Sequence, residues 1–255
     1  MTPAFLHDQH RLLEEWRFYM IRQLGRKVEF TQRDSYRETM DLLRLNQLDF
    51  AWVCDYPYLH LRKLLRLLVV PLYRGKPTYH SYLIVNARDK ESRSIGDLRG
   101  KLFAYADPYS NSGYLVPRYR IHLLGENPET FFKKSFFTWS HRKVVEAVAS
   151  GLAHGGAVDS YVWDTLATLE PELTKRTRIV WTSPGYGFPP MVAHVNNVDD
   201  ADFRQMQELL LGMSQEREGK ALLKRLNLDA FSIQSPDLYD SVAEMMQVFG
   251  EYNPA

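Results

Sequence analysis

Asp107-Pro108-Tyr109-Ser110-Asn111-Ser112-Gly113-Tyr114 is the stretch that decides how this chain is interpreted. An apolar run of strand length, residues 101–106, precedes it, and a helix-compatible run, residues 114–121, follows it. A strand, a small polar turn and a helix in this order aim several backbone N–H groups and hydroxyls at one point, which suits an anion. A plain helix cap is the alternative, because Ser and Asn are the preferred capping residues. A cap needs one of them, whereas Ser110, Asn111 and Ser112 supply three.

The composition describes an ordinary globular protein. The 255 residues are 45% hydrophobic and 25% charged, which is enough for a sizeable core in one or two domains. The net charge of +1 predicts neither nucleic-acid binding nor attraction to an acidic membrane. No segment approaches the roughly 18 to 20 apolar residues of a membrane helix. The first twenty residues carry too many charges for a signal peptide, so the chain is expected to be cytosolic, or exported with its signal outside this numbering.

The single cysteine, Cys54, predicts no internal disulfide. It stands between Val53 and Asp55, where a small buried side chain is expected rather than a nucleophile. No second cysteine or regularly spaced histidine pair accompanies it, which argues against zinc. The glycine-rich phosphate loops of nucleotide-binding proteins are absent from the sequence too. We therefore expect no metal and no cofactor.

Apolar runs of strand length alternate with helical patterns along the chain. Helices are expected at residues 8–24, 35–45, 58–65, 95–100, 114–121, 140–150, 161–169, 201–214, 216–226 and 236–249. Strands are expected at 26–31, 49–54, 67–73, 79–86, 101–106, 131–138, 155–160 and 178–181. Gly25 stands where a helix C-cap glycine belongs. This alternation predicts an α/β protein with mainly parallel sheets, and the lack of a Pro/Gly/Ser-rich linker means that two domains would be joined by strands.

Polar residues follow several of the expected strands. In open α/β sheets, ligands bind beyond the carboxyl ends of the strands. Those ends carry Asp55-Tyr56, Asp107 to Gly113, Ser140-His141 and Asp159-Ser160-Tyr161. Each has a purely structural alternative, since Asp55 and Asp159 suit helix caps, His141 suits a buried structural role, and Tyr56 and Tyr79 suit packing. Their convergence on one sheet edge favours a binding site.

A hydrolase is a further alternative. Ser112, His141 and Asp159 are the residue types of a nucleophile, a base and its orienting acid. However, no Gly-x-Ser-x-Gly pattern exists to expose the serine. A dense cluster of hydroxyls also suits holding an oxyanion better than activating one oxygen. Binding without catalysis is therefore expected.

Several segments, in order along the chain, resemble the PhnD-like phosphate/phosphite/phosphonate-binding proteins of ABC transporters. The most specific is the Asp-Pro-x-Ser-x-Ser-Gly-Tyr-Leu-Val-Pro run at 107–117. The others are Asp49-Phe50-Ala51-Trp52, residues 79–85, Ser140-His141, Val148-Ala149-Ser150-Gly151 and Val158-Asp159-Ser160. The resemblance covers nearly the whole chain.

The resemblance implies a type II periplasmic-binding-protein fold. Two α/β lobes with mainly parallel sheets, residues 1–82 plus 190–255 and residues 83–189, would be joined by two crossover strands and close on the ligand by a hinge. The implied function is the solute-binding component for phosphate, phosphite or a small phosphonate, working with a membrane permease and not with nucleic acid. The implied location is periplasmic or lipid-anchored outside the cytoplasm. The remaining alternative is a ligand-sensing domain of the same fold in a signalling system.

The resemblance also implies which residues bind the ligand. The turn Ser110-Asn111-Ser112-Gly113-Tyr114 would grip the oxyanion with its helix N-terminus, and Tyr79 and His141 would add donors. Asp55, Tyr56 and Asp159 are candidates for the rest of the site.

Three departures from the family pattern qualify these expectations. Asn111 replaces the usual Thr, which predicts an altered geometry. The loop Gly185-Tyr186-Gly187-Phe188-Pro189-Pro190 has no acid to hold an ammonium group, which favours an inorganic or small alkyl oxyanion over an aminoalkyl phosphonate. Family members also have a strand before the segment resembling Thr2-Pro3-Ala4-Phe5. Either the numbering begins inside the mature protein, or the amino-terminal sheet is incomplete.

Overall fold

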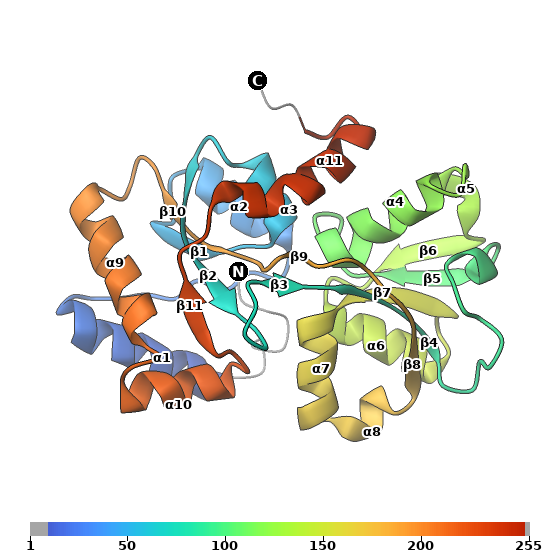
Figure 1. Ribbon diagram of the computed structural model, residues 1–255, viewed down its shortest axis with the longest axis horizontal. Coiled ribbons are helices and arrows are strands. Elements are labelled where there is room, and N and C mark those ends of the chain that lie inside the picture. The colour runs from blue at the N-terminus through green and yellow to red at the C-terminus, as the bar shows by residue number, and fades with distance from the viewer. Residues whose placement is uncertain (1–9, 253–255) are drawn as a thin grey trace. The chain divides into compact units, whose positions relative to one another are not determined.

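The computed structural model describes residues 10–252 (Figure 1). These residues form two compact units. Unit 1 is the described part of Met1–Thr78 with Gly187–Asp240, and unit 2 is Tyr79–Tyr186 with the described part of Ser241–Ala255. The lobes expected from the sequence differ from this grouping chiefly at residues 241–255, which group with unit 2. Their role as moving lobes stays a proposal, and the segment Thr2 to Phe5 lies outside the described residues.

Unit 1 combines helices with one four-stranded sheet. Its elements are α1 (His10–Leu24), α2 (Tyr36–Arg44), β1 (Phe50–Trp52), α3 (Asp55–His60), β2 (Leu65–Leu72), β10 (Met191–His194), α9 (Asp200–Gly212), α10 (Arg217–Arg225), β11 (Ala230–Ser232) and the 3₁₀ turn η4 (Pro236–Tyr239). The strands lie in the order β1-β10-β2-β11. The helix expected at 58–65 begins earlier, because Pro57 fits the first turn of α3 and Leu65 already belongs to β2.

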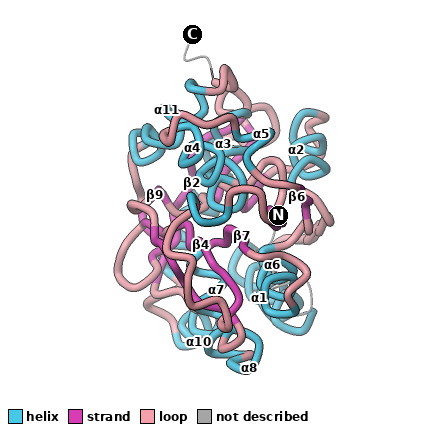
Figure 2. Tube along the Cα trace, turned by 90° about the vertical axis from the view of Figure 1, so that its right-hand side faces the viewer, coloured by secondary structure: helices cyan, strands magenta, loops and turns pink. Residues whose placement is uncertain are grey.

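Unit 2 contains a five-stranded sheet in the order β6-β5-β7-β4-β8. Its elements are β4 (Ser81–Asn86), the 3₁₀ turn η2 (Gly96–Leu98), β5 (Leu102–Tyr105), the π-helical turn η3 (Asn111–Leu115), α4 (Val116–His122), α5 (Pro128–Phe131), β6 (Lys134–Phe137), α6 (His141–Ser150), β7 (Gly155–Asp159), α7 (Ser160–Leu169), α8 (Pro171–Thr174) and β8 (Thr177–Thr182). Helix α11 (Asp240–Val248) starts at the boundary and belongs almost wholly to this unit. Figure 2 shows β4 and β7 side by side in its sheet.

The chain crosses between the units within β3 (Thr78–Tyr79) and returns within β9 (Tyr186–Gly187), and these two strands pair with each other. The α/β class and the crossover strands are therefore confirmed. The expectation of mainly parallel sheets is wrong. The pairs in unit 1 are antiparallel, and in unit 2 only β5 pairs in parallel, with β6 and β7. The reason is that β4 and β10, which each follow a crossing, run against both of their neighbours, β4 against β7 and β8 and β10 against β1 and β2.

One expected strand, at residues 26–31, is also absent. Helix α1 ends as expected at Gly25, whose φ is +67°. The alternating residues after it form no strand, although they line the same groove of about 600 Å³ as β1. The apolar face of α1, with Leu13, Trp16 and Met20, forms another wall of this groove. Among residues 10–252 no strand pairs with this segment, so its alternating pattern forms no sheet there.

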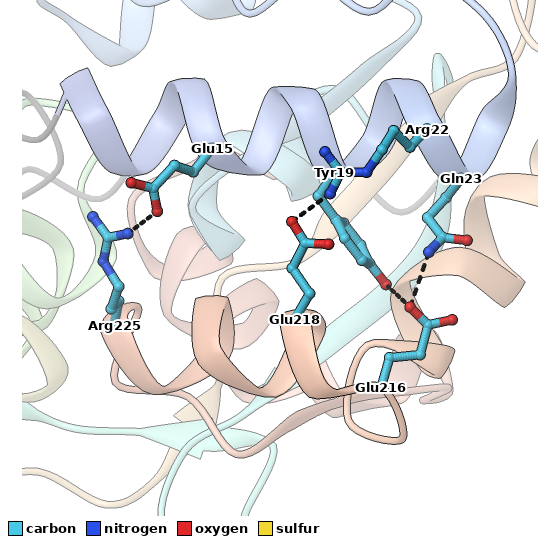
Figure 3. A network of polar contacts seen from close by, with 7 residues as sticks. All are labelled: Glu15, Tyr19, Arg22, Gln23, Glu216, Glu218 and Arg225. Atoms are coloured by element: carbon cyan, nitrogen blue, oxygen red, sulfur yellow. Dashed lines mark hydrogen bonds and ion pairs between the residues drawn. The ribbon is translucent and has the colours of Figure 1, made fainter.

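Polar contacts hold α1 against α10 (Figure 3). Glu216 accepts hydrogen bonds from the Tyr19 hydroxyl, at 3.1 Å, and from Gln23, at 2.9 Å. Glu15 pairs with Arg225, and Glu218 pairs with Arg22. Beneath these contacts Leu12, Trp16 and Tyr19 are buried, so the apolar face of α1 carries the packing.

The core of unit 2 supports the end of its central strand. Phe103, Tyr105, Phe132 and Leu98 pack together in this core, with the rings of Phe103 and Phe132 stacked at 4.2 Å. Gly155 and Gly156 of β7 lie where a Cβ atom would meet Leu98 or Val144 at 2.5 Å, which brings β7 close to its neighbours. This packing fixes the point at which β5 leads into residues 107–113. Within residues 10–252 no helix is long and apolar enough to cross a membrane.

Candidate functional site

The loop after β5 folds back on itself before the next helix begins. The Asp107 carboxylate accepts a hydrogen bond from the Tyr109 N–H at 2.8 Å, and its carbonyl accepts one from the Ser110 N–H at 2.9 Å. Ser110 is the helix N-cap, and its hydroxyl oxygen accepts from the Gly113 N–H at 3.0 Å. The capping alternative therefore holds for Ser110, which leaves Asn111 and Ser112 without a capping duty.

The helix starts with a π-helical turn, a widened turn that often marks functional sites. The Leu115 N–H bonds to the Ser110 carbonyl at 3.0 Å, and η3 then continues directly into α4. Asn111 and Ser112 lie in this first turn and are buried. Because the first N–H groups of a helix have no carbonyl within it, the turn presents donors and the positive end of the helix dipole.

Ser112 has the side chain of the loop that most clearly indicates a ligand. Its carbonyl accepts a hydrogen bond of 2.6 Å from the hydroxyl of Ser81 in β4, which fixes its backbone. Its own hydroxyl is buried and has no hydrogen-bond partner among residues 10–252. A buried hydroxyl without a partner costs roughly 1–3 kcal/mol, so a ligand that satisfied it would recover that free energy.

Gly113 allows this tight packing. A Cβ atom at this position would lie 2.5 Å from Ala106 Cβ, 2.9 Å from Ser110 Oγ and 3.0 Å from His141 Cε1. The Gly113 carbonyl also accepts from the Ala106 N–H at 3.2 Å. No larger residue fits between the end of β5, the capping serine and the histidine without moving one of them.

His141, at the start of α6, faces the loop from the other side. Its Nδ1 accepts a hydrogen bond from the Asp159 N–H at 3.1 Å, so the ring proton resides on Nε2. Nε2 lies 3.4 Å from the Ser110 hydroxyl. Burial lowers the pKa of His141 to about 3, and the ring is therefore a neutral donor. The Ser110 oxygen accepts from Gly113 and faces this donor, which leaves the serine's own proton for a ligand.

The hydrolase alternative fails on this geometry. The Asp159 carboxylate caps α7 by accepting from the Tyr161 N–H at 2.8 Å, and only the backbone of Asp159 contacts His141. His141 faces Ser110, not Ser112. A base whose Nδ1 already accepts a hydrogen bond has no carboxylate to stabilise its protonated form, so Ser112, His141 and Asp159 form no triad. Within residues 10–252 no group of acidic, histidine and cysteine side chains could hold a metal either.

Tyr79 and Tyr114 have different environments. The Tyr79 hydroxyl is buried and accepts a hydrogen bond of 3.2 Å from the Asn111 side-chain amide, which joins it to the loop. The Tyr114 ring instead packs against Tyr105 and Phe137, each at 5.1 Å, and under the guanidinium of Arg118. Tyr114 thus has a packing role in unit 2, and its contact with a ligand stays a prediction.

The structure describes Asp55 and Tyr56 within unit 1. Asp55 is buried at the first position of α3, where its carboxylate accepts from the Tyr56 N–H at 3.0 Å and from the Cys54 thiol at 2.8 Å. Cys54 is buried, as expected from its apolar neighbour. The Tyr56 ring contacts His60 at 4.8 Å. These contacts hold the Asp55 carboxylate at the start of α3, and the contribution of both residues to ligand binding stays a prediction.

The sequence did not point to two further serines that shape the loop. Ser81 donates to the Ser112 carbonyl, and the Ser183 hydroxyl accepts from the Ser81 N–H at 2.8 Å. Both lie in or beside strands of the sheet, away from any helix start. The only feature of the sequence that could have indicated the role of Ser81 is that a serine occupies a buried position of β4.

Comparison with known proteins places the chain in a family. Residues 1–239 match the family model described as "ABC transporter, phosphonate, periplasmic substrate-binding protein". The chain is 27% identical over 241 residues to the phosphonates-binding periplasmic protein of Escherichia coli K12, a match that covers 89% of this chain and 70% of the relative. It is 26% identical over 174 residues to the phosphate-import protein PhnD of Mycolicibacterium smegmatis, covering 64% of this chain and 54% of that protein.

Solved structures agree on the fold. PhnD1 of Prochlorococcus marinus, determined in complex with methylphosphonate, superposes with a TM-score of 0.84 at 20% sequence identity, over 94% of this chain and 93% of that one. The type II periplasmic-binding-protein fold is thereby confirmed. The chain belongs to the family of periplasmic substrate-binding proteins of phosphonate ABC transporters, which bind a solute for a transporter and are not enzymes.

Proposed function

We propose that the loop from Ser110 to Gly113 binds the oxyanion of phosphate, phosphite or a small phosphonate. The observation that carries this proposal is the buried, unpartnered hydroxyl of Ser112 at the first turn of the helix formed by η3 and α4. An anion there would accept from that hydroxyl and from the N–H groups of the turn. The dipole of the helix adds roughly 0.3–2 kcal/mol for an anion at its N-terminus.

The hydrogen-bond donors of the loop and of His141 carry no net charge. Ser110 has a proton to donate once its oxygen has accepted from Gly113, and Nε2 of His141 is protonated while the ring as a whole is uncharged. Hydrogen bonds to an ionised acceptor are worth about 1.5–3 kcal/mol each. The hydroxyls of Ser110 and Ser112 can each donate one such bond, and the N–H groups of the turn and the helix dipole add to them.

The second half of the proposal concerns the size and charge of the ligand. Phe188, in the loop at 185–190, is buried, its ring contacts Tyr73 at 6.2 Å, and its carbonyl accepts from the Tyr239 hydroxyl. The nearby Tyr186 hydroxyl lies 3.7 Å from Met245 Sδ. The Asp159 carboxylate is engaged as the cap of α7. Because the loop at 185–190 contains no acidic residue and the Asp159 carboxylate caps α7, an inorganic or small alkyl oxyanion is favoured over a ligand with an ammonium group.

We also propose that the protein acts outside the cytoplasm, free in the periplasm or anchored by a lipid, and delivers its ligand to the permease of its transporter by closing two lobes. The periplasmic family supports this location. Fractionation of cells that express the full-length gene would test it. Recovery of the protein in the cytoplasmic fraction alone would contradict it.

Calorimetric titration tests the ligand. We expect phosphate, phosphite or methylphosphonate to bind more tightly than 2-aminoethylphosphonate, and Ser112→Ala to weaken binding by about ten- to a hundredfold, the equivalent of one charge-assisted hydrogen bond. Ser150→Ala is the matched control, because it removes a hydroxyl that bonds only to Ala147 at the end of α6. If no anion binds below the millimolar range and Ser112→Ala changes nothing, the proposal is wrong.

A further inference from the structure

The hydroxyl of Ser81 links a strand of the sheet to the loop that carries Ser112. Ser81 is the first residue of β4 and is 1% exposed. Its hydroxyl donates to the Ser112 carbonyl at 2.6 Å, which lies at the short end of the range for such bonds. Because a carbonyl can only accept, the proton of the Ser81 hydroxyl is committed to this bond. The strand thus determines where the backbone of Ser112 lies.

The helix backbone cannot satisfy the Ser112 carbonyl in the register that the structure shows. The Val116 N–H donates to the Asn111 carbonyl, five residues earlier, as in a π-helix. The next donor in this register would be the N–H of residue 117, but Pro117 has none. The Ser112 carbonyl is therefore left for a donor outside the helix, and Ser81 supplies it.

The same bond decides between two registers of the first turn. In an α-helix the Ser112 carbonyl would accept from the Val116 N–H, four residues further on. A buried carbonyl without a partner is unfavourable, so loss of the Ser81 hydroxyl would favour this α-helical bond over the π-helical one to Asn111. The change of register would rotate Ser112 about the helix axis and move its hydroxyl away from its present position.

The sheet fixes Ser81 itself. Ser81 is paired with Asp159 of β7, and its N–H donates to the Ser183 hydroxyl at 2.8 Å while its carbonyl accepts from the Ser183 N–H at 3.0 Å. The N–H of Asp159 is the donor that orients His141. One strand pair, β4 with β7, therefore supports both sides of the site, with Ser81 holding Ser112 and Asp159 holding His141. A support of this kind on rigid elements is what a preorganised binding site requires.

We propose that Ser81 is a positioning residue of the oxyanion site, which keeps the first turn π-helical and thereby holds the Ser112 hydroxyl in place for the ligand. Its own proton is committed to the Ser112 carbonyl, so Ser81 acts through Ser112 and not on the ligand. The affinity for the oxyanion then depends on a strand residue outside the loop. This inference rests on the proposed function of the loop.

The test is a double-mutant cycle, in which methylphosphonate, phosphite and phosphate are titrated calorimetrically into the parent protein, Ser81→Ala, Ser112→Ala and the double variant. We expect Ser81→Ala to weaken binding about tenfold, the equivalent of one hydrogen bond. The losses from the two single substitutions should not add, because Ser81 acts through the hydroxyl that Ser112→Ala removes. Additive losses would overturn the inference, and so would parental affinity in Ser81→Ala.

Ser81→Thr and Ser92→Ala are the matched controls. Ser81→Thr keeps the hydroxyl, a cavity of about 20 Å³ beside Ser81 gives room for the added methyl group, and the affinity should stay near that of the parent. Ser92→Ala removes an equally buried hydroxyl of unit 2, which bonds to Asp89 at 2.7 Å, and should leave the affinity unchanged. An equal loss of affinity in Ser92→Ala and Ser81→Ala would reduce the role of Ser81 to general stability and overturn the inference. If Ser81→Ala does not fold, Ser81→Cys replaces it, because a thiol of similar size is a weak donor.

Nuclear magnetic resonance gives a reading that needs no ligand. The amide proton of Val116 should shift in Ser81→Ala, since its acceptor changes from Asn111 to Ser112, and should not shift in Ser92→Ala. If an oxyanion binds the parent protein and Ser112→Ala weakens it, but neither the affinity nor the Val116 resonance depends on Ser81, this inference is overturned and the proposed function stands. If no oxyanion binds the parent protein, the proposed function fails, and this inference fails with it.

Discussion

His141 Nδ1 accepts a hydrogen bond from the backbone N–H of Asp159, at 3.1 Å. A backbone N–H can only donate, so this one bond fixes the tautomer of the imidazole and puts the proton on Nε2, toward Ser110. The same bond would be lost if His141 took up a second proton. The buried histidine is therefore built to stay neutral, which suits a donor in a binding site and not a general base.

The stability of the protein should fall as the solution is acidified below the ordinary pKa of histidine. Burial lowers the pKa of His141 from 6.5 to about 3 in the folded state. Between these two values the unfolded chain binds one more proton than the folded chain, so stability rises with pH, by up to about 1.4 kcal/mol per pH unit from this residue. Urea unfolding at pH 7, 6, 5 and 4 measures the slope.

His141→Gln is the comparison for that slope, because glutamine accepts from the Asp159 N–H without titrating. We expect the variant to show a shallower loss of stability between pH 6 and 4 than the parent protein. Equal slopes would show that His141 does not remain neutral in the fold. The affinity for the oxyanion should not follow a histidine titration between pH 5 and 8.

Gly113→Ala should damage both stability and binding. The added methyl group would overlap the Ala106 side chain and press on the Ser110 hydroxyl, which moves the first turn of the helix. Overpacking of this kind costs about 1–3 kcal/mol, and we expect the affinity for the oxyanion to fall at least tenfold. Gly212→Ala in α9 is the control, because its Cβ meets nothing within 4 Å and alanine favours a helix. A folded Gly113→Ala protein with parental affinity would contradict the assigned geometry.

The local structure around the candidate site could be predicted from the sequence because its residues share one short segment. Ser110 to Gly113 had to follow a strand and precede a helix, and both elements are present. The separate roles of the two serines could not be predicted. The order of residues does not show that the Ser110 hydroxyl caps the helix while the Ser112 hydroxyl has no hydrogen-bond partner among the described residues. The π-helical register of the first turn decides which serine does which. The bond from Ser81 depends on which strands are neighbours and is invisible to local patterns.

Most elements of the fold were likewise predictable, whereas strand directions were not. Alternation between helix and strand patterns fixes the class, but the direction of a strand depends on where the chain leaves and re-enters a sheet. β10 shows this most clearly. Its four buried residues, Met191 to His194, lie between β1 and β2 and run against both, and no local pattern indicates a returning strand.

The segment from Lys27 to Thr31 should exchange its amide protons rapidly. Its polar and apolar residues alternate as in a strand, but none of it is paired in a sheet, and a groove of about 600 Å³ borders it. Unpaired amides exchange at a far lower opening cost than those of a central strand. Hydrogen exchange followed by mass spectrometry should therefore separate this segment from β2, which is paired on both sides. Slow exchange at both segments would mean that residues 27–31 do pair with a strand.

The contacts between α1 and α10 should differ sharply in their contribution to the free energy of unfolding, although Figure 3 shows them side by side. Tyr19 is a buried side chain whose hydroxyl donates to Glu216, and removal of that acceptor leaves a partly buried donor unsatisfied. Glu216→Ala should therefore lower the free energy of unfolding by about 1–2 kcal/mol. Glu15 is partly exposed, and its pairs with Arg11 and Arg225 are surface ion pairs that water replaces readily. Glu15→Ala should change the unfolding midpoint in urea by no measurable amount, and equal effects of the two substitutions would show that Tyr19 does not depend on Glu216.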